Sequence, residues 1–145
     1  MKARKAWKAP RDTDGNRAWL IAARDREPII ATIGGSPLTL ERIDCSGAIG
    51  RRAIIRRFAA ALDFPAWFGG NWDSLADCLD DLSWRPAPQG RVLVVDGLEG
   101  CRLAQPQVVD LLVELLDDVA QRHAARSEIF QALVVVPSQA FDAMP

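Results

Sequence analysis

The sequence predicts an α/β protein in which a small parallel sheet of about three strands packs against helices, with an extension at the N-terminus. Two observations support this class. Continuous apolar runs at residues 92–95 and 133–136 are typical of strands that are buried on both faces. Segments with apolar residues at helical spacing alternate with strand-like runs along the chain, and this order is typical of parallel sheets with crossover helices.

Residues 1–37 are expected to form a basic arm with an accessory hairpin, ahead of a main domain at residues 38–145. The segment up to residue 17 is polar, basic and aperiodic, so we expect it to be disordered. Short apolar runs at residues 19–23 and 29–33 are interpreted as the two strands of the hairpin. A Gly-Gly-Ser-Pro turn signal then marks the start of the main domain.

The main domain is expected to begin with a strand, a helix and an aromatic loop. Apolar residues alternate at residues 38–44, as they do in a half-buried strand. Residues 49–62 carry apolar side chains at helical spacing, and four arginines occupy another face. Pro65 keeps the chain extended after this helix, so residues 64–70 form a loop that is rich in aromatic residues and glycine.

Two helices and two strands complete the predicted domain. Asn71 is a suitable N-cap for a helix over residues 72–82. Prolines and a glycine at residues 85–90 predict a loop, which leads into the first of the two buried runs. Pro106 fits the first turn of a long helix that ends near residue 126, and the second buried run follows it.

The net charge of −1 conceals a strong asymmetry along the chain. Residues 1–57 hold 13 Lys and Arg against 6 Asp and Glu, whereas residues 58–145 hold 5 against 13. Such a division concerns binding partners more than the fold. The acidic half favours a basic partner and argues against nucleic acid as its ligand.

Three cysteines at wide, irregular spacing match neither a disulfide framework nor a zinc site, and they fit a reducing compartment. Residues 1–17 lack the apolar segment of a secretion signal. No apolar run approaches the roughly 20 residues that a membrane span requires. We therefore expect a soluble cytoplasmic protein that does not associate with membranes.

The predicted helix over residues 72–82 carries a row of carboxylates. Asp73, Asp77 and Asp81 recur at intervals of four residues, and each such like-charge pair costs roughly 0.2–0.5 kcal/mol in an isolated helix. Residues 61–84 contain five acids and no Lys or Arg to offset this cost. Aromatic residues flank the row, so it has the composition of an interface that binds a cationic pocket. A solvated acidic helix face with aromatics in the core remains the alternative interpretation of these residues.

The motif around this row resembles the barstar family of intracellular ribonuclease inhibitors. It consists of Phe-Pro, two aromatics, Gly, one residue, Asn, one residue, Asp, then Leu and Asp-Cys-Leu. Residues 64–79 match closely, and a looser pattern extends over residues 38–137. The resemblance implies a non-enzymatic immunity protein without a cofactor. It also implies a one-to-one complex with a basic, extracellular-type ribonuclease or related toxin, in which carboxylates take the place of RNA phosphates.

The resemblance also implies which residues bind the partner. Asp77 matches the carboxylate that enters the phosphate pocket of the nuclease, and Asp73 matches one that pairs with basic groups. Trp67 takes the place of a tyrosine that covers the catalytic histidine. The full expected set, on the loop and the two helices, is Trp67, Gly69, Asn71, Asp73, Ala76, Asp77 and Asp118.

Three members of this set carry particular expectations. Gly69 matches a glycine that lets the partner approach the backbone closely, and Ala76 stands where the family often has a tryptophan. Asp118 is placed on the surface by helical periodicity alone, as the counterpart of an acid on the family's next-to-last helix. The departures from the family pattern, namely Ala76, Trp67 and the segment before residue 38, concern the identity of the target more than the binding mode.

Some residues would also suit functions other than inhibition. An enzyme would rely on His123, which lies near a helix C-terminus where a cation is favoured anyway, or on Asp96, which ends a strand-like run. The arm at residues 1–17 has basic residues and a tryptophan that suit weak contacts with nucleic acid. A second hypothesis is that the arm folds back over the acidic row. A barstar-like fold with a target other than a nuclease is the remaining alternative.

Overall fold

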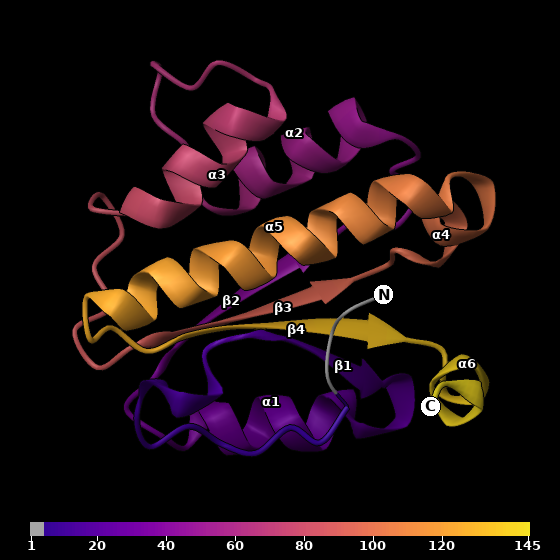
Figure 1. Cartoon of the computed structure of the whole chain (residues 1–145), viewed down its shortest axis with the longest axis horizontal. Coiled ribbons are helices and arrows are strands. Elements are labelled where there is room, and N and C mark those ends of the chain that lie inside the picture. Colours follow the sequence, from indigo (N-terminus) through magenta and orange to yellow (C-terminus); the bar gives the residue numbers. More distant parts are fainter. Residues whose placement is uncertain (1–4) are drawn as a thin grey trace.

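The computed structural model describes residues 5–145 and contains one four-stranded sheet in the order β1-β4-β3-β2. Every neighbouring pair of strands is parallel. Three helices cover one face of the sheet and α1 covers the other (Figure 1). The strands are β1 (Ala18–Ala22), β2 (Thr39–Asp44), β3 (Arg91–Asp96) and β4 (Phe130–Val136). The helices on the first face are α2 (Arg51–Ala61), α3 (Trp72–Asp81) and α5 (Pro106–Ala125), and α1 is Arg26–Gly34.

The alternation of side chains along β3 and β4 explains why both strands are continuously apolar. Leu93 and Val95 of β3 face the layer formed by α2, α3 and α5. Val92 and Val94 face the opposite layer, which includes Ile33 of α1. Successive side chains of a strand point to opposite faces, so a central strand covered by helices on both sides needs apolar residues at every position.

The predicted α/β class with a parallel sheet is confirmed, and the sheet has four strands instead of about three. The extra strand is β1, which pairs with β4 at the edge of the sheet. Short helices α4 (Glu99–Ala104) and α6 (Ser138–Ala143), which the sequence analysis did not include, follow β3 and β4. Short 3₁₀ turns at Thr13–Gly15 and Ala23–Asp25 flank β1.

The accessory hairpin expected at residues 19–33 is wrong. The first apolar run lies in β1, but the second lies in α1, where Ile33 is buried and Ile29 packs beside it. Pro28 occupies the first turn of α1, a position that needs no backbone N–H. The isoleucines four residues apart therefore form one helical face against the sheet, and β1 pairs with β4 instead of with a hairpin partner.

The expectation of a disordered arm is also wrong for residues 5–17. The indole N–H of Trp7 donates to Gln131 Oε1 at 2.6 Å, and Lys5 Nζ donates to the carbonyl of Met144 at 2.8 Å. The buried amide of Asn16 donates to the carbonyls of Ala120 and Glu128. These contacts are with β4, α5 and the C-terminal segment, so this part of the arm does not fold over α3. Residues 1–4 of the arm lie outside the described residues, and a domain boundary at residue 38 stays a prediction.

Candidate partner-binding surface

Helix α3 presents its acidic row outward because its opposite face is fixed in the core. Leu75, Cys78 and Leu79 are buried, which leaves Asp73 and Asp77 exposed on the other side. The helix begins at the predicted N-cap, where Asn71 Oδ1 accepts a hydrogen bond of 2.8 Å from the backbone N–H of Ser74. The cap satisfies one of the free N–H groups of the first turn and thereby fixes where the row starts.

The acidic row is not neutralised by the rest of the chain. Within residues 5–145, no ion pair joins Asp73, Asp77 or Asp81 to a cation, and all three are exposed. Asp80 adjoins the row, one helical repeat after Asp73, but it pairs with Arg126, whose Nη1 is 3.0 Å from Asp80 Oδ1. The repulsion along the row therefore remains unrelieved in the isolated protein.

A groove of about 330 Å³ runs between α3 and α5 and brings Asp118 to the same surface as Asp73. Its apolar floor and walls include Ala76, whose small side chain leaves the space between the two helices open. The position of Asp118, expected from helical periodicity alone, is thus beside the acidic helix. The groove is lined by Trp72, Asp73, Ala76, Leu111, Glu114, Leu115, Asp118 and Arg122.

Trp72 contributes an unsatisfied donor beneath this groove. Its indole Nε1 is buried and has no hydrogen-bond partner among the described residues. A buried donor without an acceptor costs about 1–3 kcal/mol, and native structures contain few of them. The surface thus combines two unfavourable features, a repulsive acidic row and an unsatisfied indole, neither of which is explained by the stability of the free protein.

The loop before α3 exposes an aromatic side chain that other rings support. Trp67 is 60% exposed, and its ring meets that of Trp84 edge-to-face at 6.0 Å. Trp84 also meets Phe64 at 6.0 Å and donates its indole N–H to the carbonyl of Leu62 at 2.9 Å. Sequence reasoning missed Trp84, although a tryptophan directly after the acidic helix and before a proline-rich loop was a visible signal.

Gly69 has an internal reason to be glycine, which the sequence did not reveal. A Cβ at this position would lie 2.5 Å from the hydroxyl oxygen of Ser74. That hydroxyl donates to Asn71 Oδ1 at 2.8 Å and is therefore part of the cap of α3. A side chain at residue 69 would therefore displace the hydroxyl of Ser74 from the cap of α3.

The sequence model of the family described as Barstar (barnase inhibitor) matches residues 38–135, more than half of the chain. The chain belongs to the barstar family. The description places this family among ribonuclease inhibitors and not among enzymes. No match was found among curated proteins or among solved structures. The matched range of the barstar family includes all seven residues expected to bind the partner, whereas β1 and α1 precede it.

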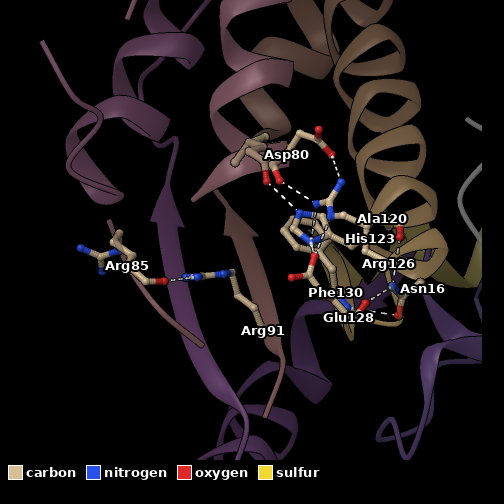
Figure 2. A network of polar contacts seen from close by, with 10 residues as sticks. Asn16, Asp80, Arg85, Arg91, Ala120, His123, Arg126, Glu128 and Phe130 are labelled. Carbon is tan, nitrogen blue, oxygen red and sulfur yellow. Dashed lines mark hydrogen bonds and ion pairs between the residues drawn. The ribbon is translucent and has the colours of Figure 1, made fainter. Parts of the chain in front are cut away.

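The residues considered for catalysis have structural partners in this member of the barstar family. Asp96 pairs with Arg26 at 3.1 Å, and Arg42 lies at 3.7 Å. Cys45, which was not a candidate from the sequence, is also unsuited to be a nucleophile, because burial raises the pKa of its thiol to about 12. His123 is buried between two hydrogen-bond partners (Figure 2). Within residues 5–145, His, Cys, Asp and Glu side chains form no group of three or more that could hold a metal ion.

None of the helices among residues 5–145 combines the length and the hydrophobicity that crossing a lipid bilayer requires.

Proposed function

We propose that this protein inhibits a small, basic ribonuclease or ribonuclease-like toxin by covering its active site with α3 and the preceding loop. The observation that carries the proposal is the unpaired, exposed row of Asp73 and Asp77, of which Asp73 lines the same groove as Asp118. Membership of the barstar family supports the class of partner. A basic partner would relieve the repulsion that the free protein sustains along α3.

Inhibition on this proposal is steric and electrostatic and involves no chemical step. Asp77 and Asp73 occupy the sites at which the nuclease binds RNA phosphates. Asp118, on the neighbouring helix α5, pairs with a further cation of the nuclease. Trp67 and the backbone around Gly69 and Asn71 cover the catalytic groups. Because opposite charges attract over several ångströms, association is fast at low salt and slows as salt screens the charges.

The proposed complex has one copy of each protein and contains no cofactor. Three free cysteines, all buried, support a reducing compartment such as the cytoplasm. In that compartment the inhibitor would protect the producing cell from the toxin before or after its export. Lys5 and Trp7 are engaged in contacts within the chain, which weakens the alternative that the arm binds nucleic acid.

Titration calorimetry against a small, basic, guanyl-specific ribonuclease tests the proposal. The wild type is compared with Asp77→Ala and with the control Asp25→Ala, an exposed carboxylate beside α1 on the other face of the sheet. Both variants change the net charge by the same amount, so long-range attraction is matched. We expect one-to-one binding that weakens at least a hundredfold in Asp77→Ala and less than threefold in the control. Equal binding by both variants would refute the acidic helix as the site, and no binding by the wild type would point to another basic protein.

A further inference from the structure

The C-terminal end of α3 is held by side chains of α5 and the turn that follows it. A helix leaves its last four carbonyls without partners inside the helix. The carbonyl of Leu79 accepts a hydrogen bond of 2.9 Å from His123 Nε2, and the carbonyl of Asp80 accepts one of 2.7 Å from Arg126 Nη2 (Figure 2). Leu82 caps the helix in the left-handed region, with its N–H bonded to the carbonyl of Cys78. Two of the last four carbonyls of the acidic helix thus depend on residues 123 and 126.

His123 is itself immobilised, so the contact with α3 is rigid. The imidazole is 7% exposed and stacks on the ring of Phe130 at 4.5 Å. Its Nδ1 lies 3.0 Å from Glu128 Oε1, an oxygen to which Arg126 Nε also donates at 2.9 Å. Asn16 holds the same turn, because its amide donates to the carbonyl of Glu128 at 2.8 Å. The network therefore joins the end of α3 to the start of β4, as Figure 2 shows.

The hydrogen bond from His123 to α3 exists in both protonation states of the ring. A carbonyl oxygen only accepts, so Nε2 must carry a proton. In the cation, Nδ1 donates to the carboxylate of Glu128. In the neutral ring, Nδ1 accepts from Arg126 Nη2, which lies 3.3 Å away. Without a proton on Nδ1, that nitrogen and Glu128 Oε1 would face each other as two acceptors at 3.0 Å, whereas the bond from Nε2 to Leu79 would remain.

Helix α5 carries both this anchor and one of the proposed binding carboxylates. Asp118 precedes His123 by five residues, or about 7.5 Å along the helix axis. His123 therefore belongs to the same helix as Asp118, and Arg126 follows directly at the C-cap of that helix. An anchor of this kind sets the position of α3 along α5, and with it the distances between Asp118 and the carboxylates of Asp73 and Asp77.

We infer that His123 and Arg126 are positioning residues for the partner-binding surface: they hold α3 in the place at which its carboxylates and Asp118 meet the partner together. This inference rests on the proposed function. Neither residue needs to contact the partner. Loss of the anchor leaves every binding carboxylate present, so the long-range attraction and the association rate are kept. The complex then dissociates faster, because part of the binding energy is used to reposition α3.

The test compares two substitutions of similar size at residue 123. His123→Leu keeps the volume but removes the donor, whereas His123→Gln places an amide N–H where Nε2 was. Amide hydrogen exchange of α3 and the kinetics of binding to the small, basic ribonuclease are measured for both. For the leucine variant we expect exchange in α3 and dissociation each to accelerate about tenfold, the loss of one hydrogen bond, with association unchanged within twofold. The glutamine variant should restore both values to within threefold of the wild type.

Two further variants keep the result interpretable. Arg126→Met tests the second contact at a residue whose side chain is 44% exposed, so its loss does not threaten folding. Arg102→Ala is the control, since that guanidinium bonds to Glu99 of its own helix and to no other side chain among residues 5–145. Exchange in α3 that is unchanged in the His123→Leu and Arg126→Met variants would overturn the inference, as would faster exchange with unchanged dissociation. Failure of the wild type to bind the nuclease would instead remove the proposed function, and the inference with it.

Discussion

Glu41→Gln should destabilise the protein strongly, because it removes the only negative charge that contacts a buried arginine within the described part of the chain. The side chains of Glu41 and Arg91 are 8% and 6% exposed, and Arg91 Nη1 lies 2.5 Å from Glu41 Oε2. Arg85 Nη2 reaches the other carboxylate oxygen at 2.7 Å. Burial lowers the pKa of Arg91 below its ordinary value and the carboxylate opposes that shift, so the charged guanidinium depends on Glu41.

The loss in the free energy of unfolding of Glu41→Gln follows from leaving the buried charge of Arg91 without its partner. Breaking such a pair from one side costs about 3–5 kcal/mol, since the remaining arginine keeps its desolvation penalty and also faces Arg85. Urea unfolding at pH 7, followed by tryptophan fluorescence, measures the change in the free energy of unfolding. Glu27→Gln is the matched control: its carboxylate is 67% exposed, so we expect a change below about 0.5 kcal/mol.

A second variant separates the charge from the packing. Glu41→Leu combined with Arg91→Leu removes both charges, and we expect it to recover most of the loss seen in Glu41→Gln. A loss below about 1 kcal/mol in Glu41→Gln would refute the reasoning, because the arginine would then be solvated or paired in another way. Equal losses in the single and double variants would show that packing, and not the unpaired charge, determines the cost.

Three more changes have defined outcomes. Trp84→Ala removes the ring that supports Trp67, so dissociation from the basic ribonuclease, measured by surface plasmon resonance, should accelerate about threefold to tenfold. Gly69→Ala should cost about 1 kcal/mol in urea unfolding, because the new Cβ displaces the capping hydroxyl of Ser74. The same change in a Ser74→Ala background should cost less than half as much. The pKa of Glu128 lies below its ordinary value of 4.5, since burial, which raises it, is outweighed by the hydrogen bonds and charges of Arg126 and His123. Its contribution to stability is therefore present above that pH and lost on further acidification, a dependence that Glu128→Gln should flatten in unfolding measured from pH 6 to pH 3.

The parts of the site that follow local rules could be predicted from the sequence. A spacing of four residues placed Asp73 and Asp77 on one outward face, because the helical repeat alone decides which side chains share a face. Asn71 as N-cap depends only on its position before an amphipathic segment. Asp118 was placed by the periodicity of a long helix with a broad buried face, and the groove beside Asp73 agrees with it. In each of these cases, local geometry determined the result.

The parts that depend on distant packing could not be predicted in the same way. The apolar runs of β1 and α1 are each about five residues long, too short for periodicity to separate a strand from a helix, and Pro28 was the neglected signal. From the sequence, His123 was interpreted only in relation to the end of its own helix. Its contact with the end of α3 was not predicted. Its bond to Leu79 joins residues 44 positions apart, and no local pattern specifies such a pairing.

The anchor at the end of α3 offsets part of the energetic cost of the acidic surface. A helix C-terminus carries partial negative charge, so Asp80 and Asp81 at this end are unfavourable in addition to the repulsion along the row. Helix α3 has no basic residue in its last turn to offset this. Arg126 supplies a cation from outside, bonded to both the carboxylate and the carbonyl of Asp80. This compensation comes from the turn after α5 and is directed at Asp80 alone. Among the described residues, the carboxylates of Asp73, Asp77 and Asp81 therefore stay unpaired and available to a basic partner.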